Sequence, residues 1–312
     1  MKVLITGGAG FIGSHVCDAF IAKDAEIHVI DDLSAGRAGR LPDGAVLHRQ
    51  DILDAQRLIG LVLEVRPQLI CHLAAQVDVR ASVADAAADA AINIVGTVNV
   101  LEAARAVDAR VVMSSTGGAL YGKDAPVPSS ESVPPEPESP YGISKYSAEQ
   151  YIGLYNRLYG SAHAILRFAN VYGPRQSPSG EAGVVTVFCS QAIKHKPLTI
   201  YGDGKQTRDY VYVGDCVAAF LAAAEHDQAG IWNIGNGTEV SVLELASMIA
   251  QITGDDTEAE FAPARIGELQ RSALESQHAE RDLGWRPSIP LADGVEAVVR
   301  WLAAGALDRA LS

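Results

Sequence analysis

Two residues near the middle of the chain, Tyr141 and Lys145, have the types and the spacing needed for proton transfer. An i, i+4 pair lies on one face of a helix. A phenol with a pKa of about 10 is a poor base at neutral pH, and a nearby cation stabilises its phenolate form. The pattern predicts a general base, Tyr141, activated by Lys145. The alternative is an exposed helix pair with no chemical role.

A glycine-rich segment lies close to the start of the chain. Residues 7–13 read Gly-Gly-Ala-Gly-Phe-Ile-Gly, after an apolar run at residues 3–5 and at the opening of a helix-length segment, residues 11–22. Glycines let the backbone approach a pyrophosphate, whose charge then meets the N–H groups and the positive dipole end of the helix. A plain tight turn is the alternative. The position between strand and helix favours a dinucleotide-binding loop.

Two carboxylates end the next predicted strand. Residues 27–30 lead into Asp31 and Asp32, about where an acidic residue beyond the glycines meets the adenosine ribose. A carboxylate there accepts hydrogen bonds from the ribose hydroxyls and repels a 2′-phosphate, so NAD is favoured over NADP. A solvated loop carboxylate is the alternative, and Arg37 and Arg40 could serve a 2′-phosphate, which keeps NADP open.

Segments of strand length and helix length alternate around these residues. Strands are predicted at residues 3–5, 27–30, 46–49, 69–73 and 110–114, and helices at residues 11–22, 54–65, 85–107 and 141–159. This alternation predicts an α/β fold with a doubly wound parallel sheet of the Rossmann type.

The chain after this sheet has a different pattern. Six prolines at residues 126–140 predict a surface loop, and the pattern becomes irregular after residue 171. We therefore expect an NAD-binding domain with the catalytic pair at residues 1–170. Residues 171–312 should form mainly a smaller substrate-binding lobe, with some segments returning to the large domain.

Composition limits the possible partners and the compartment. Lys and Arg number 25 against 38 Asp and Glu, a net charge of −13 without a dense basic run, which argues against nucleic-acid binding. The four cysteines are scattered without a Cys-x-x-Cys pair, which fits a reducing cytoplasm. The apolar start is too short for a signal peptide or a membrane span. We expect a cytoplasmic protein with no membrane contact and no metal.

Four motifs occur in the order in which one enzyme family has them. They are the glycine segment of residues 7–13, His72-Leu73-Ala74-Ala75, Asn93-x-x-Gly96-Thr97 and Tyr141-x-x-x-Lys145. On these motifs the chain resembles the extended short-chain dehydrogenase/reductases over nearly its whole length. The resemblance implies bound NAD and a Ser/Thr-Tyr-Lys triad, in which a hydroxyl from the strand end orients a sugar and lowers the barrier to proton transfer.

The hydroxyl of this triad has more than one candidate. Aligned from the strand end, Ser114-Ser115-Thr116, the position falls on Thr116, with Ser115 as the second candidate. The loop is one residue longer than in the commonest epimerase version, so counting back from Tyr121 would place Gly117 there instead.

The resemblance also implies the set of residues that contact the cofactor. They are Gly7, Gly10, Phe11, Ile12, Gly13, Asp31, Asp32, Asp51, Ile52, Leu73, Ala74, Ala75, Gln76, Asn93, Ser114, Tyr141 and Lys145. Within this set, Asp51 and Ile52 would frame the adenine. Asn93, which the family uses near the lysine, could equally be a helix-interior amide bonded to backbone.

Segments in the second half look like the nucleotide-sugar members of the family. Asn170 would contact the diphosphate or sugar, and Arg208 and Arg265 the diphosphate, while Glu268 would bind the uridine ribose. Planar guanidinium donors suit a diphosphate, although each arginine alone could form a surface ion pair. The implied substrate-binding set is Thr116, Tyr141, Asn170, Val184, Val185, Tyr201, Arg208, Arg265, Glu268 and Ser272.

The implied activity is the interconversion of UDP-galactose and UDP-glucose through a 4-keto intermediate, with NAD bound throughout. The 4,6-dehydratases place an Asp-Glu pair after the catalytic hydroxyl, where this chain has Gly117-Gly118, so dehydration is disfavoured. UDP-glucuronate decarboxylation or epimerisation is harder to exclude. A noncatalytic NAD-sensing regulator would be expected to lack the Tyr141 and Lys145 pair.

Sugar selectivity and assembly are the last two expectations. Many epimerases carry a bulky residue where this chain has Ser272, so room for a 2-N-acetyl group, and hence use of UDP-GlcNAc, is a hypothesis. The resemblance implies a homodimer in which the helices at residues 85–107 and 141–159 form a four-helix bundle with their copies. Their alanine-rich faces could serve the intramolecular core instead.

Overall fold

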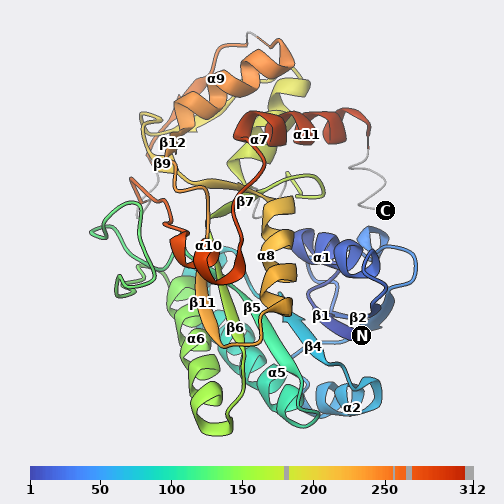
Figure 1. The fold of residues 1–312 in the computed structure, drawn as a ribbon. Coiled ribbons are helices and arrows are strands. Elements are labelled where there is room, and N and C mark those ends of the chain that lie inside the picture. The colour runs from blue at the N-terminus through green and yellow to red at the C-terminus, as the bar shows by residue number, and fades with distance from the viewer. Residues whose placement is uncertain (179–182, 256, 265–268, 306–312) are drawn as a thin grey trace.

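A seven-stranded parallel sheet forms the centre of the larger lobe (Figure 1). The computed structural model describes residues 1–178, 183–255, 257–264 and 269–305. The strand order is β11-β6-β5-β4-β1-β2-β3. The strands are β1 (Lys2–Thr6), β2 (Glu26–Asp31), β3 (Val46–Arg49), β4 (Leu69–His72), β5 (Arg110–Thr116), β6 (Ala164–Phe168) and β11 (Gly230–Ile234). This topology confirms the predicted doubly wound parallel sheet.

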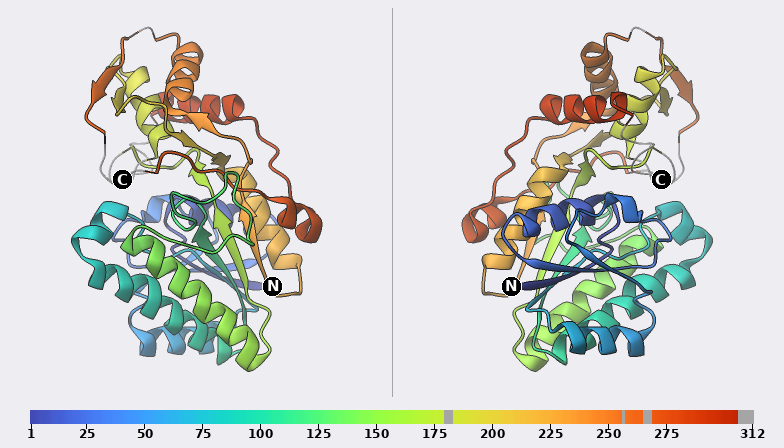
Figure 2. Two further views of the ribbon diagram at one scale, coloured as in Figure 1. Left: turned by 90° about the vertical axis from the view of Figure 1, so that its left-hand side faces the viewer. Right: turned by 90° about the vertical axis from the view of Figure 1, so that its right-hand side faces the viewer.

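Helices cover both faces of this sheet, as the two views in Figure 2 show. On one face α1 (Phe11–Ile21), α8 (Val213–Glu225) and α10 (Gln277–Leu283) bury one apolar core. On the other face α2 (Ala55–Val65), α5 (Gly96–Arg105) and α6 (Pro140–Tyr159) bury a second core. The strands are therefore apolar on both sides, and every residue of β4 is buried.

A smaller lobe has a third apolar core of its own. Helices α7 (Val184–Ile193), α9 (Val242–Thr253) and α11 (Leu291–Ala303) surround it. Two short strand pairs accompany them: β8 (Thr199–Tyr201) with β13 (Glu260–Ala262), and β9 (Thr207–Arg208) with β12 (Val240–Ser241). This lobe lies at the top of Figure 1.

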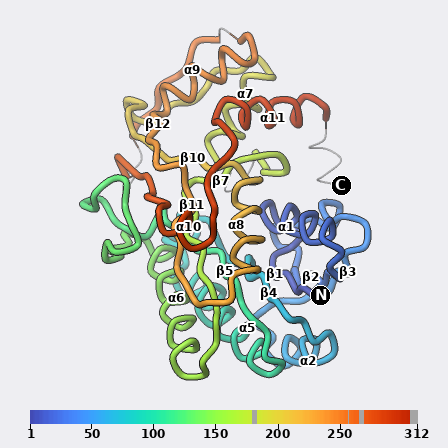
Figure 3. The backbone as a smooth tube through the Cα atoms, in the orientation of Figure 1, coloured from blue at the N-terminus to red at the C-terminus, as the bar shows by residue number. Residues whose placement is uncertain are grey.

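The chain passes several times between the lobes, as the tube in Figure 3 shows. One residue after β6 it forms β7 (Asn170–Tyr172), which pairs with β10 (Tyr210–Tyr212). It returns from β10 directly into α8 and β11, and then enters the smaller lobe again at β12 and α9. The junction between the lobes is thus built from segments that are far apart in the sequence.

The predicted helix at residues 85–107 is interrupted. The structure has α4 (Ala86–Ala90), a π-helical turn η2 (Ala91–Val95) and then α5, preceded by a short helix α3 (Val79–Ala84). A π turn holds one extra residue and often marks a functional site. The remaining helical piece is the 3₁₀ turn η1 (Ala38–Arg40). Within the described residues, no helix combines the length and the apolar character required to cross a membrane.

Candidate active site

The glycine segment forms a backbone cradle between β1 and α1. Gly7 adopts a φ of +70°, and a Cβ atom on Gly13 would lie 2.2 Å from the Gly7 carbonyl oxygen. Gly10 is the N-cap of α1 without a side-chain cap, and Phe11 and Ile12 open the helix, whose first turn has no acidic residue. A helix N-terminus of this kind leaves backbone N–H groups available for an anion. The cradle fits the pyrophosphate of a dinucleotide.

The two carboxylates after β2 have different surroundings. Asp31 is 7% exposed, and its Oδ2 and Oδ1 accept hydrogen bonds from Ala9 N at 3.0 Å and Leu33 N at 2.9 Å. Burial raises the pKa of Asp31, although both N–H donors oppose that shift. Asp32 is exposed and accepts hydrogen bonds from Ser34. Asp31 thus anchors the glycine loop and keeps further acceptor positions, because a carboxylate has about four.

Further residues predicted to contact the cofactor lie at the ends of β3 and β4. Asp51 accepts a hydrogen bond from Leu53 N at 2.8 Å, and Ile52 is buried under Gly96. Residues 73–76, which include Leu73, Ala74, Ala75 and Gln76, follow β4. A Cβ atom on Gly7 would lie 2.6 Å from Ala74 N, so this segment forms a wall directly beside the glycine loop.

A buried histidine that sequence reasoning gave no role ties this wall to the loop. His72 Nδ1 lies 2.7 Å from the Thr6 hydroxyl, and Nε2 lies 2.9 Å from the Thr97 hydroxyl. Thr97 donates in turn to the Asn93 carbonyl oxygen at 2.7 Å. Burial, assisted by the charge of Lys145, lowers the pKa of His72 to about 3, so the imidazole is neutral. The sequence signal for a structural role of His72 was its place in the His72-Leu73-Ala74-Ala75 motif at the end of β4.

Asn93 occupies the π turn and joins three segments through its side chain. Its Nδ2 donates to the Gln76 carbonyl oxygen at 3.0 Å, to Asp89 Oδ1 at 3.1 Å and to Ser144 Oγ at 3.1 Å. Its Oδ1 accepts from Gln76 N at 2.9 Å. The amide therefore links the wall after β4 to α6, the helix that carries Tyr141 and Lys145.

Local signals set the start of α6 at the candidate base. The Ser139 hydroxyl caps the helix by accepting from Gly142 N at 3.1 Å, and Pro140 fills the first turn. Tyr141 follows, and its N–H donates to Ser82 Oγ at 3.2 Å. Lys145 is 4% exposed, and burial lowers its pKa to about 8, with Glu149 and Asp89 opposing the shift. The buried Lys145 therefore lies one helical turn after Tyr141 on the same helix.

The three hydroxyls at the end of β5 have different partners. Ser114 Oγ donates to the His72 carbonyl oxygen at 3.3 Å, and Ser115 Oγ donates to Glu149 Oε1 at 2.5 Å. Thr116 Oγ1 accepts from Ala119 N at 3.2 Å and has no acceptor for its own proton among the described residues. This geometry favours Thr116 over Ser115 as the hydroxyl that could orient a substrate.

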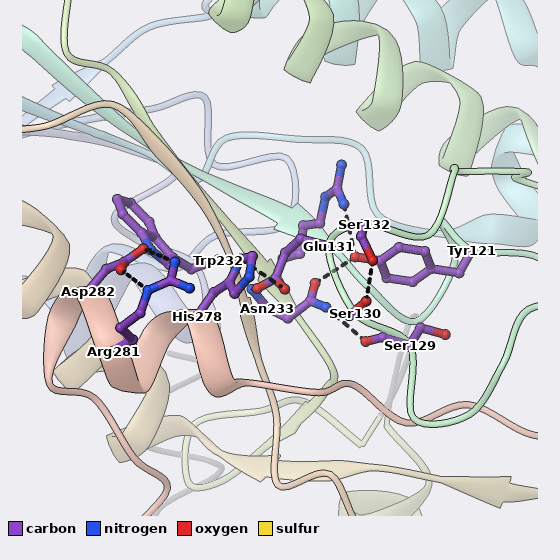
Figure 4. A network of polar contacts seen from close by, with 11 residues as sticks. Tyr121, Ser129, Ser130, Glu131, Ser132, Trp232, Asn233, His278, Arg281 and Asp282 are labelled. Atoms are coloured by element: carbon purple, nitrogen blue, oxygen red, sulfur yellow. Dashed lines mark hydrogen bonds and ion pairs between the residues drawn. The ribbon is translucent and has the colours of Figure 1, made fainter.

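A buried ion pair below these hydroxyls was not predicted from the sequence. Arg167 and Glu149 are 3% and 2% exposed, and Arg167 Nη2 donates to Glu149 Oε2 at 2.6 Å. Arg167 Nη1 also donates to the Tyr121 hydroxyl at 2.9 Å, which donates in turn to Asn233 Oδ1 at 2.8 Å. Figure 4 shows how Asn233 then reaches the loop that carries Ser129. This pair left no signal in the sequence, because a glutamate and an arginine are also the usual partners of an exposed salt bridge.

The predicted substrate-binding residues lie on several different segments of the chain. Asn170 begins β7, and its Oδ1 would lie 3.4 Å from a Cβ atom on Gly118, in the loop at residues 117–121 after Thr116, here called the catalytic loop. Arg208 ends β9 at the junction of the lobes, and Tyr201 ends β8. Ser272 is half-buried beside Ala273.

Two valines at the start of α7 differ from the polar members of this set. Val185 is 1% exposed and belongs to the core of the smaller lobe, where Val184 also packs. Their side chains therefore contribute to the core of the smaller lobe. Arg265 and Glu268 lie outside the described residues. Among the described residues, no group of three or more His, Cys, Asp or Glu side chains is arranged to hold a metal ion.

Comparisons with known proteins agree with this arrangement. Residues 3–235 match the NAD dependent epimerase/dehydratase family. A UDP-glucose 4-epimerase from Mycolicibacterium smegmatis is 44% identical over 308 residues, with 96% of this chain and 98% of the relative covered. A crystal structure of a UDP-glucose 4-epimerase from Thermotoga maritima with UDP-glucose gives a TM-score of 0.96 at 41% identity, covering 98% of this chain and 100% of that one.

A second solved structure comes from another organism. The UDP-glucose 4-epimerase of Thermus thermophilus in complex with NAD gives a TM-score of 0.92 at 39% identity, covering 97% of this chain and 99% of that one. These proteins share the fold over almost their whole length, as the resemblance to the extended short-chain dehydrogenase/reductases predicted. The chain belongs to the NAD dependent epimerase/dehydratase family.

Proposed function

We propose that this protein is an NAD-dependent UDP-glucose 4-epimerase, which interconverts UDP-galactose and UDP-glucose through a 4-keto intermediate. One observation supports this most directly. The buried Lys145 ammonium lies one helical turn from Tyr141, and Ser144, Asn93 and Gln76 connect this turn to the wall beside the glycine loop. Relatives that carry this activity in their names are 44% identical over nearly the full length.

The residues of the chain fit NAD as the cofactor. The glycine cradle has no room for a side chain at Gly13, and Asp31 keeps acceptor positions toward a ribose. The carboxylate also opposes a 2′-phosphate. When bound, NAD would accept a hydride from carbon 4 of the sugar and later return it.

In this mechanism Tyr141 removes the proton from the sugar 4-hydroxyl and later returns it. Lys145 stabilises the phenolate through its positive charge, and Thr116 orients the 4-oxygen with its uncommitted hydroxyl proton. Asn170 and Arg208 would hold the sugar and the diphosphate. The net redox change is nil, so the cofactor need not leave during turnover.

The loop after Thr116 argues against a dehydratase. The chain has Gly117 and Gly118 where elimination would need carboxylates, and a Cβ atom on Gly117 would lie 2.4 Å from Leu274 Cδ1, so a side chain there would have to displace Leu274. This packing favours epimerisation over dehydration.

A homodimer is part of the proposal. An apolar stripe runs along the outside of α6 and the neighbouring π turn, with Val95, Ile143, Tyr151, Leu154 and Leu158 between 36% and 62% exposed. An exposed apolar stripe of this kind is typical of a protein interface. We also place the protein in a reducing cytoplasm, since its cysteines Cys17, Cys71, Cys189 and Cys216 are all free and buried.

The test is to incubate the purified protein with UDP-galactose, without added cofactor, and to identify the products by NMR. We expect UDP-glucose from the wild type and from Tyr151→Phe, a matched control on the same helix, but not from Tyr141→Phe. If added NAD⁺ gives no UDP-glucose while another nucleotide sugar is converted, the substrate assignment is wrong. If both tyrosine variants remain active, Tyr141 is not the base.

A further inference from the structure

Asp209 is a buried carboxylate that the mechanism above does not use. It lies between β9 and β10, and its side chain is 1% exposed. Its Oδ1 accepts from Asn236 N at 2.9 Å, and its Oδ2 accepts from Gly237 N at 3.0 Å and Leu274 N at 3.2 Å. Within the described residues it forms no ion pair, so backbone N–H groups alone compensate its charge.

These hydrogen bonds hold together segments that are distant in the sequence. Asn236 and Gly237 follow β11 of the large sheet, while Leu274 belongs to the segment that leads from the smaller lobe to α10. The Asp209 carbonyl oxygen accepts from Asn170 N at 2.9 Å. Gly235 packs against the carboxylate so closely that a Cβ atom there would lie 2.5 Å from Oδ2. A buried carboxylate is costly, and these contacts specify one arrangement of the junction.

One of the held segments touches the catalytic loop. Leu274 is 1% exposed, and its side chain packs directly on Gly117, the residue after Thr116. On the other side, Arg208 immediately precedes Asp209, and Asn170 N donates the backbone hydrogen bond to the Asp209 carbonyl oxygen described above. Asp209 is thus connected to all three positions that would orient the hydroxyl, the sugar and the diphosphate. Its carboxylate reaches the residue after Thr116 through Leu274. Its carbonyl oxygen binds Asn170, and Arg208 is its neighbour in the chain.

We propose that Asp209 is a positioning residue for the reaction, which holds Arg208 and Asn170 in register with Thr116 across the junction of the two lobes. The inference rests on the proposed function. Asp209 should affect turnover through its contact with Leu274, which packs on Gly117, in addition to stabilising the fold. A displacement of reacting groups by about 1 Å can reduce turnover by about a hundredfold.

Asp215 provides a matched control in the same chain. It is 2% exposed and accepts from Ser288 N at 3.0 Å, Ser288 Oγ at 2.7 Å and Ile289 N at 3.2 Å. It lies in the first turn of α8 and anchors the segment that leads to α11. Replacement of either aspartate by asparagine removes an acceptor and turns an NH₂ group toward backbone donors. Only Asp209 has contacts that lead to the catalytic loop.

The experiment compares Asp209→Asn with Asp215→Asn for thermal stability, kcat and KM with UDP-galactose, well below both melting temperatures. We expect similar losses of stability, and a kcat that falls by about tenfold or more only in Asp209→Asn. Equal kcat values in the two variants would overturn the proposal. If Asp209→Asn does not fold, Leu274→Val tests the contact with Gly117, and a kcat equal to that of the wild type would be the contrary result.

Hydrogen exchange of the residue 114–121 peptide separates this inference from the proposed function. We expect faster exchange there in Asp209→Asn than in Asp215→Asn, whatever the substrate is. A wild type that does not convert UDP-galactose, together with this exchange difference, would overturn the substrate assignment and leave the positioning role supported. An active wild type with identical exchange in both variants would overturn the positioning role alone.

Discussion

The Ser115 hydroxyl donates to the Glu149 carboxylate at 2.5 Å, whereas the proton of the Thr116 hydroxyl, one residue later, has no acceptor among the described residues. We therefore expect Thr116→Val to reduce kcat by about a hundredfold or more, because general acid–base assistance is worth about 10²–10⁴. Ser115→Ala should retain most of the activity and lose stability instead. Steady-state rates and urea unfolding of both variants check this. The reverse pattern would make Ser115 the triad hydroxyl.

Removal of one partner of the buried Glu149 and Arg167 pair should strongly destabilise the folded protein. Removal of one partner leaves the other charge buried and uncompensated, which costs about 3–5 kcal/mol. We expect Arg167→Met to lose this amount in urea unfolding, and Glu149→Gln with Arg167→Met to recover part of it. If the double variant is less stable than either single variant, the two residues do not act as a buried pair.

Stability should fall as the pH decreases below about 6.5. Burial lowers the pKa of His72 to about 3 and of His163 to about 4. The unfolded chain then binds protons that the folded protein excludes, so each histidine removes about 2 kcal/mol between about pH 7.5 and pH 5. Denaturant unfolding at the two pH values measures the loss, and His163→Gln should make it smaller by about half. A pH-independent unfolding free energy would contradict neutral buried imidazoles.

Ser272 gives a prediction about sugar selectivity. Its small, half-buried side chain would leave room for a 2-N-acetyl group, so we expect the wild type to accept UDP-GlcNAc as well as UDP-galactose. Ser272→Tyr should reduce turnover of the acetylated sugar by about tenfold or more and spare the plain sugar. Ser272→Ala, which keeps the side chain small, is the control. The hypothesis fails if the ratio of the two rates is the same in Ser272→Tyr and the wild type.

The sequence predicted the elements whose local signals agree with their tertiary role. The glycine segment, the five strands β1 to β5 and the helix at Tyr141 were all identified, because apolar runs, glycines and a Ser-Pro start determine them locally. The break in the helix at residues 85–107 was missed. Asn93 in this break contacts Gln76 and Ser144, and such contacts between segments that are distant in the sequence leave no local signal.

The polar groups inside the protein could not be predicted for a related reason. Glu149 and Arg167 lie on a helix and a strand 18 residues apart, and only the fold shows that they face each other. Likewise, counting along the chain left Ser115 and Thr116 as alternatives, whereas the alternation of side chains along β5 gives them different partners. Strands of two or three residues, such as β9 and β12, carry too little pattern to be recognised.

The position of β11 at the edge of the large sheet also affects how the protein is made. Residues 230–234 pair with β6 only after the ribosome has synthesised much of the smaller lobe. Until then the outer edge of β6 offers unpaired N–H and C=O groups, which favour association with other strands. The sheet of the N-terminal half therefore stays incomplete until residues 230–234 have left the ribosome, when part of the smaller lobe has already been made.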